Sequence, residues 1–214
     1  MSLHHLPDGQ GGTTKTLRIT GVNVQLLAGS HDGFPNGLGN LILGDNELGN
    51  TAWGDFRTGS HNLVMGSRLS YQGDFSIVAG HENLSAYGGG HVLGGFRNAS
   101  AVGGTVISGT DNIAGGDHSV ILTGDGNETV GFQSVIGTGW NNFVGYHHAA
   151  IVGGRDNEIA FTGAGSVLVG GEANTIGTVP SEFVTSDFAV LSGGRNRTLI
   201  DDHGWSAGSL SEDE

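Results

Sequence analysis

The sequence lacks cysteine altogether and has only three prolines and a single lysine, Lys15, among its 214 residues. Without cysteine the chain can form no disulfide framework, thiolate metal site or cysteine nucleophile. Basic residues are scarce: 8 Lys and Arg stand against 21 Asp and Glu, which gives a formal net charge of −13. A basic patch able to neutralise phosphates is therefore missing, and we expect neither nucleic acid nor an anionic membrane surface as a partner.

Long hydrophobic runs are missing as well. No apolar stretch approaches the roughly 18 residues of a transmembrane helix, so we expect no membrane insertion. The first ten residues carry no hydrophobic signal-peptide segment. A secretion signal or an anchor would therefore have to lie outside this sequence.

Glycine, by contrast, makes up 42 of the 214 residues. It does not fall at every third position, which excludes collagen. Aliphatic residues recur at fixed distances from the glycines, whereas disordered glycine-rich linkers are poor in such residues. Glycine therefore punctuates an ordered repeat.

The repeat is seen when the sequence is aligned on one glycine per unit, with most intervals at 14 or 15 residues. These glycines are Gly44, Gly66, Gly80, Gly95, Gly109, Gly124, Gly139, Gly154, Gly171 and Gly194. Three residues before each lies an aliphatic residue: Leu41, Leu63, Ile77, Val92, Val106, Ile121, Ile136, Ile151, Leu168 and Leu191. Such a ladder predicts an all-β fold, a parallel β-solenoid or β-roll of about ten coils of 14–15 residues, with these side chains inside.

An asparagine recurs three residues after seven of these glycines. The series is Asn83, Asn98, Asn112, Asn127, Asn142, Asn157 and Asn174. A tight turn with positive φ explains the fixed offset, because Gly and Asn tolerate that conformation best. A ladder of ligands for ions or glycans is the alternative.

A second aliphatic ladder lies two residues before the glycines, where Gly137 and Ser192 are the exceptions. Its members are Ile42, Val64, Val78, Leu93, Ile107, Leu122, Val152 and Val169. Adjacent residues of a strand point to opposite faces, so this ladder is expected outside the coil. No helix or further sheet is left in the sequence to cover it. The pattern therefore predicts an obligate oligomer of parallel rods with these residues at the interface.

Two stretches resemble the head repeats of trimeric autotransporter adhesins of the YadA type: residues 134–137, Ser-Val-Ile-Gly, and residues 166–174. Residues 36–44 and 57–64 are similar to a module of bacterial surface proteins and phage-like tail fibres. The resemblance implies a left-handed parallel β-roll assembled as a homotrimer. It also implies an extracellular or cell-surface location, or a place in a phage-like fibre. Repeats of mostly 15 rather than 14 residues depart from the adhesin pattern, and no neck, coiled-coil stalk or membrane anchor is present in the sequence.

The predicted organisation has four parts. Residues 1–16 are expected to be a lead that is either disordered or left over from cloning. Residues 17–40 are expected to be a capping strand or hairpin, because apolar and polar residues alternate from Leu17 to Leu26. Residues 41–210 hold the repeats, with irregular intervals at 45–58 and 177–188. Residues 211–214 are expected to be an acidic tail.

No motif in the sequence supports a catalytic, metal or cofactor site. Gly204-Trp205-Ser206-Ala207-Gly208 matches a nucleophile elbow, but that motif requires a strand-to-helix turn. Rings of His91, His118, His147 and His148 around a threefold axis, calcium at turn aspartates such as Asp111, and a Glu158–Glu172 carboxylate pair are weaker alternatives. We therefore predict no enzyme activity, no metal and no cofactor.

Irregular intervals of a solenoid form loops, which are a common place for recognition. The candidate ligand-binding residues are Trp53, Phe56, Arg57, Trp140 and Phe183. The leading hypothesis is a structural or adhesive trimer, with a host-surface glycan or receptor as a possible further partner. Two others remain open: a glycan-binding or polysaccharide-degrading module of a tail fibre, and a self-assembling filament subunit.

Overall fold

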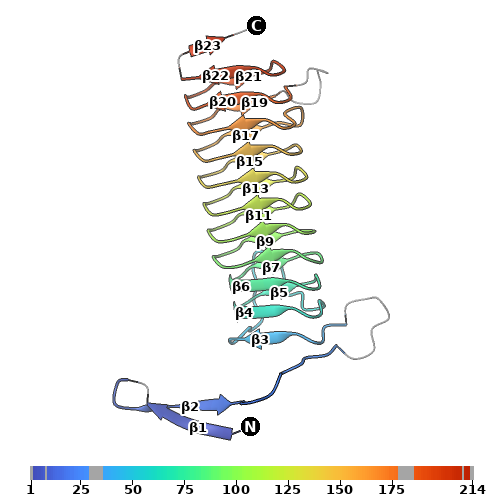
Figure 1. The fold of residues 1–214 in the computed structure, drawn as a ribbon, viewed down its shortest axis with the longest axis vertical. Helices are drawn as coiled ribbons and strands as arrows, with labels where there is room; N and C mark the ends of the chain where they lie inside the picture. The colour runs from blue at the N-terminus through green and yellow to red at the C-terminus, as the bar shows by residue number, and fades with distance from the viewer. Residues whose placement is uncertain (1, 8, 29–35, 178–185, 209, 213–214) are drawn as a thin grey trace.

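The computed structural model describes residues 2–7, 9–28, 36–177, 186–208 and 210–212. Within these residues the protein is a parallel β-solenoid without any helix, preceded by an antiparallel hairpin (Figure 1). The described part of the chain thus contains no helix long and apolar enough to cross a membrane. The all-β, parallel solenoid fold predicted from the repeat is confirmed.

Two sheets run along the length of the solenoid, with strands of successive turns paired in parallel. The twelve-stranded sheet contains β3 (Leu41–Leu43), β4 (Leu63–Ser67), β6 (Ile77–His81), β8 (His91–Val92), β10 (Thr105–Val106), β12 (Val120–Ile121), β14 (Val135–Ile136), β16 (Ala150–Ile151), β18 (Val167–Leu168), β20 (Val190–Ser192), β22 (Trp205–Ala207) and the antiparallel β23 (Leu210–Glu212). The nine-stranded sheet contains β5 (Ser70–Tyr71), β7 (Leu84–Ser85), β9 (Ala99–Ser100), β11 (Ile113–Ala114), β13 (Glu128–Thr129), β15 (Phe143–Val144), β17 (Glu158–Ile159), β19 (Thr175–Ile176) and β21 (Thr198–Leu199). Nine turns therefore contribute a strand to both sheets, where the repeat count predicted about ten coils.

The core lies between the two sheets. From β10 to β22 each strand buries one side chain, whereas β5, β7 and β9 each bury both of their residues. On the twelve-stranded sheet the predicted inward ladder is confirmed from the turn of Val92 onwards, where Val92, Val106, Ile121, Ile136, Ile151, Leu168 and Leu191 are all completely buried. On the nine-stranded sheet Ala114, Thr129, Val144, Ile159 and Ile176 are equally buried and face them. The core is thus a stack of aliphatic rungs.

The inward ladder is displaced by one residue in the first turns. Val64 and Val78, predicted to point outward, are completely buried, and they pair in register with each other and with Val92. Leu63 and Ile77 are the residues that face outward. The reason is that two residues separate Val92 from its glycine but only one separates Val78 from Gly80. At β3 the inward position falls to Ile42, not to Leu41.

The repeated glycines allow the turns to approach one another closely. Gly124 has φ of +116°, and a Cβ at this position would lie 2.3 Å from the carbonyl oxygen of Gly139 in the next turn. Any side chain there would push the two turns apart. Glycine is consequently required by the close backbone approach as well as by the backbone conformation.

The repeated asparagines are buried and link successive turns. Asn142 donates its backbone N–H and its Nδ2 to Oδ1 of Asn127, both at 3.0 Å. The Nδ2 of Asn142 also donates to the carbonyl oxygen of Gly154, at 3.0 Å. The positive φ predicted for asparagine belongs instead to the residue before it, such as Asn141 with φ of 53°.

The two ends of the chain differ from the predicted organisation. At the N terminus β1 (Ser2–Pro7) and β2 (Thr13–Arg18) form a hairpin, where the sequence led us to expect a lead that is either disordered or left over from cloning. Residues 19–27 form no strand, and Ile42 of β3 stays 45% exposed, so the first turn is not covered as a cap would cover it. At the C terminus Ser211 and Glu212 belong to β23 rather than to an acidic tail. Residues 213–214 lie outside the described residues.

Candidate functional site

The irregular interval 45–58 folds against the side of the first turns. The backbone N–H of Asn46 donates to the carbonyl oxygen of Gly66 at 3.2 Å, which fixes the start of the interval. Near its end, the N–H of Tyr71 donates to the carbonyl oxygen of Phe56 at 2.7 Å. The interval is thus hydrogen-bonded to β4 and to β5, one strand of each sheet.

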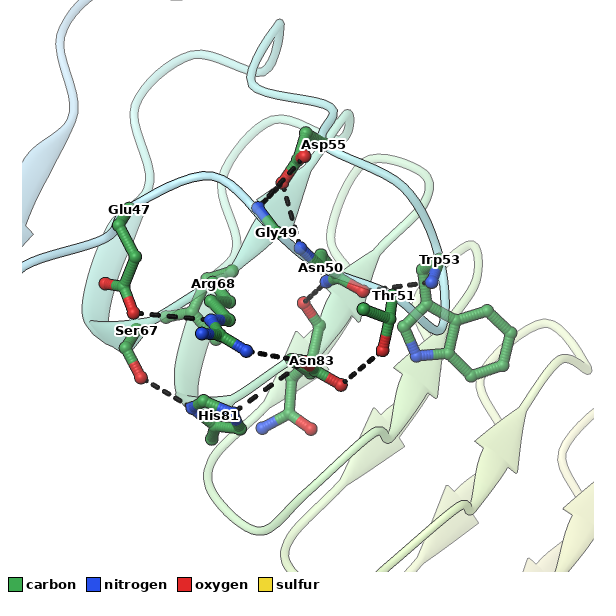
Figure 2. A network of polar contacts seen from close by, with 12 residues as sticks. Glu47, Gly49, Asn50, Thr51, Trp53, Asp55, Ser67, Arg68, His81 and Asn83 are labelled. Atoms are coloured by element: carbon green, nitrogen blue, oxygen red, sulfur yellow. Dashed lines mark hydrogen bonds and ion pairs between the residues drawn. The ribbon is translucent and has the colours of Figure 1, made fainter.

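Asp55 holds the loop of this interval closed (Figure 2). Its carboxylate accepts the backbone N–H groups of Asn50, at 3.1 Å, and Gly49, at 2.9 Å. These two bonds favour the charged carboxylate and lower the pKa of Asp55 below its ordinary value. Asn50 in turn accepts the N–H of Trp53 at Oδ1, at 2.9 Å. A closed ring of polar contacts therefore sets the shape of the loop.

A buried carboxylate, Glu82, joins the interval to the turns beneath it. Only 4% of Glu82 is exposed. Thr51 donates its hydroxyl to Oε2 at 3.1 Å, and Arg68 approaches Oε1 at 3.4 Å (Figure 2). Arg68 also pairs with Glu47 at 3.4 Å. The charge of Glu82 is thus compensated, as a buried carboxylate requires, and the interval is held by ionic as well as backbone contacts.

Three candidate residues lie on this interval. Figure 2 shows the indole of Trp53 pointing away from the ion pairs, while Phe56 is 44% exposed. Arg57 donates Nη2 to the carbonyl oxygen of Glu47 at 2.7 Å. The guanidinium of Arg57 therefore serves the loop's own structure, whereas the ring of Phe56 faces solvent.

Trp140 lies several turns away, in an exposed ladder of single β-bridges. The ladder consists of His81, Phe96, Thr110, Asp125, Trp140, Arg155, Glu172 and Arg195. The guanidinium carbon of Arg155 lies 6.0 Å from the centroid of the Trp140 ring, and Arg155 also forms an ion pair with Glu172 that raises the pKa of Arg155. Trp140 remains 49% exposed. Trp53, Phe56 and Arg57 are therefore close together, Trp140 is apart from them, and Phe183 lies outside the described residues.

A shallow groove of about 290 Å³ lies on the outer face of the nine-stranded sheet beside Asn141, the residue that follows Trp140. Phe143 forms its floor between Glu128 and Glu158, which are its neighbours in the sheet register. The sequence motifs did not single out this groove, although Glu128, Phe143 and Glu158 occupy the same position of three successive repeats. Comparing the residues at this one position across successive repeats would have revealed the groove from the sequence.

An apolar surface lies on the outer face of the twelve-stranded sheet. Of the residues predicted for an interface, Leu93, Ile107, Leu122, Val152 and Val169 lie on this face and are 42–52% exposed, whereas Ile42 occupies the inward position of β3. Val64 and Val78 leave this set, because they are buried inside their own turns. The sequence prediction missed a second outward ladder on the other side of the buried rungs, with Leu63, Ile77, Val120, Val135, Val167 and Val190. His91 and Thr105 are polar members of this ladder. The outer face therefore carries two ladders of mainly apolar side chains.

The weaker chemical alternatives find no support in the described residues. Within that part of the chain no three His, Asp or Glu side chains lie close enough to hold a metal ion. Glu172, which was considered as one member of a carboxylate pair with Glu158, forms ion pairs with Arg155 and Arg195. Ser206 of the elbow-like motif is 4% exposed and lies within β22. No protein family, curated protein or solved structure gives a match to this chain.

Proposed function

We propose that this protein is a non-enzymatic structural or adhesive module, a homotrimer of parallel β-solenoids displayed on a bacterial surface or in a phage-like fibre. The observation that supports it is the outer face of the twelve-stranded sheet, where aliphatic side chains flank most of the buried rungs, with His91, Thr105, Gly137 and Ser192 as the exceptions. Soluble monomers rarely expose a contiguous apolar patch larger than a few hundred Å². Neighbouring copies that bury this face against one another remove it from water.

The shape of the rungs favours identical partners. Each turn presents the same two outward positions, as in Val120 and Leu122 or Val167 and Val169, at the spacing of paired strands. A second copy aligned in parallel presents its rungs at the same spacing, so every rung meets an equivalent rung. The proposal of three copies and of a surface location rests on the resemblance to adhesin head repeats. A rigid rod suits a spacer or a receptor-binding head.

The mass of the protein in solution tests the proposal. Light scattering coupled to size exclusion is expected to give three times the chain mass, and a stable folded monomer would overturn the assembly. The variant Ile107→Asp/Leu122→Asp places charges in the centre of the outer face and is expected to shift the protein to smaller species. The control Thr175→Asp/Thr198→Asp adds the same charge to the outer face of the nine-stranded sheet and is expected to leave the mass unchanged.

A glycan-binding function is the second candidate, and the groove beside Asn141 favours it. The groove offers an aromatic floor at Phe143 with flanking carboxylates, and the indole of Trp140 is exposed nearby. Flat aromatic faces with adjacent polar acceptors suit sugar rings. Binding on a glycan array that is lost in Trp140→Ala and retained in Trp53→Ala would support this function and locate the site.

A further inference from the structure

A histidine, His91, lies among the aliphatic ladders on the outer face of the twelve-stranded sheet. It takes the outward position of β8, next to Ile77 of the preceding turn and Thr105 of the following turn. Its side chain is partly buried, and Leu93, on the other side of the buried Val92, is 43% exposed. Among the described residues that flank the buried rungs from β4 to β22, His91 is the one whose side chain can gain or lose a charge near neutral pH.

The imidazole of His91 takes part in the hydrogen bonding between turns. In the preceding turn the backbone N–H of Leu63 donates to the carbonyl oxygen of Ser76 at 3.0 Å, which is the usual link between neighbouring strands of this sheet. The backbone N–H of Ile77 instead donates to Nδ1 of His91, at 3.1 Å. A backbone amide can only donate, so Nδ1 carries no proton and the ring is neutral in this arrangement.

Protonation of His91 is incompatible with this arrangement. Both nitrogens of an imidazolium are donors, so the N–H of Ile77 would lose its acceptor. The new positive charge would lie beside the aliphatic side chains of Ile77 and Leu93. In a single chain water can solvate that charge, whereas a second copy packed on the outer face would exclude the water and make the charge costly.

We propose that pH controls the self-association of this protein through His91, whose neutral ring is buried between copies and whose protonation separates them. This inference rests on the proposed self-association through the outer face and adds its regulation. Imidazole titrates at about pH 6.5 in water. Because the assembly takes up the neutral ring, association is favoured above this pH and is weakened as the pH falls through it.

The charged groups of the surrounding turns do not compensate a protonated His91. Residues 72–114 form the three turns packed together here, and their other titratable groups are Asp74, His81, Glu82, Tyr87, Arg97 and Asp111. Asp74 accepts the backbone N–H of Ser60 at 2.6 Å, and Asp111 pairs with Arg97 at 2.5 Å. Glu82 pairs with Arg68. Each of these carboxylates therefore has a partner of its own, and within the described residues none of them forms an ion pair with His91.

The net charge of the chain predicts the opposite response to acid. The formal net charge is −13 with all 10 histidines neutral. Protonating histidines makes this charge less negative, so the repulsion between neighbouring rods falls and association would strengthen. A weakening of association in acid would therefore identify a particular buried group and not the overall charge.

Sedimentation of the full chain at about pH 7.5 and about pH 5.5 tests the proposal. The concentration of half-dissociation is expected to rise about tenfold in acid, because imidazole is mostly charged one pH unit below its midpoint. His91→Asn keeps an acceptor for the N–H of Ile77 but does not titrate, so this variant is expected to show no rise. His147→Asn is the matched control: Nδ1 of His147 accepts the N–H of Phe132 at 3.0 Å, but His147 lies in the turn between β15 and β16, outside the apolar ladders. This variant is expected to respond to acid like the unmodified protein.

A second variant guards against a folding defect in His91→Asn. His91→Thr repeats the residue of the next turn, Thr105, and is also expected to show no rise, while circular dichroism at both pH values checks that each protein stays folded. The same rise in the His91 variants as in the unmodified protein would overturn the role of His91. Unchanged or tighter association of the unmodified protein in acid would overturn it too. A monomer mass at both pH values would instead overturn the self-association itself.

Discussion

Asn127 shows how single residues hold adjacent turns together. Its Oδ1 accepts two N–H groups of Asn142, and its Nδ2 donates to Gly139 in the next turn and to Asn112 in the preceding one. Asn127→Ala removes a completely buried amide and leaves the backbone N–H of Asn142 without its acceptor. We expect a loss of about 3 kcal/mol in the free energy of unfolding, measured by urea denaturation, because each buried unsatisfied group costs about 1–3 kcal/mol.

The neighbouring Asn141 provides the matched control for this prediction. Asn141 is exposed, has positive φ, and donates Nδ2 to Asp156 at the surface. Gly126 occupies the equivalent position one turn earlier. Asn141→Gly is therefore expected to change the free energy of unfolding by less than about 1 kcal/mol. Equal losses of unfolding free energy in Asn127→Ala and Asn141→Gly would contradict a stabilising role for the buried asparagine ladder.

At the scale of the element, the carboxylate of Asp55 stabilises the closed loop of the interval 45–58. Backbone hydrogen bonds from Asn50 and Gly49 hold the pKa of Asp55 below its ordinary value. The stability that the charged carboxylate of Asp55 contributes is consequently present above the unfolded-state pKa of about 3.9. It is lost as the pH falls through the lower folded-state pKa. Asp55→Asn is expected to lower the melting temperature at neutral pH and to melt like the unmodified protein once the pH lies below the folded-state pKa of Asp55.

Thermal unfolding followed by circular dichroism checks this prediction. Asp201→Asn, an exposed carboxylate near the opposite end of the rod, serves as the control. If the melting temperature of Asp55→Asn stays below that of the unmodified protein by the same amount in acid, the carboxylate charge is not the cause of the difference.

The strands show how much of the fold the sequence could predict. The aliphatic positions and their period predicted a parallel solenoid, because a ladder of this kind can be buried only by stacking turns. They could not assign the inward face in the first turns, since Leu63-Val64 and Ile77-Val78 each offer two adjacent aliphatic residues. Pairing with Val92 decides the face there, and a slip of one residue turns every side chain to the other side.

The candidate site was harder to predict for a related reason. Trp53, Phe56 and Arg57 were identified because their interval breaks the period, and the structure places them together on one loop. The buried Glu82, which fixes the loop, lies in a regular turn. The repeat pattern therefore does not distinguish it from other turn residues. Its pairing with Thr51 and Arg68 depends on contacts between segments about 14 to 31 residues apart, which periodicity does not encode.

At the scale of the whole molecule, charge opposes the assembly that the apolar face favours. Each chain carries a formal net charge of −13 at pH 7, and side-by-side rods bring these charges together. Raising the salt concentration from about 0.01 M to 0.15 M shortens the Debye length from about 30 Å to about 8 Å and screens this repulsion. We therefore expect the concentration of half-dissociation, measured by sedimentation, to fall as salt is added. A rise would mean that attraction between opposite charges outweighs repulsion between the rods. The apolar outer face would then be a minor part of the interface, and Ile107→Asp/Leu122→Asp would leave the mass unchanged in the same experiment.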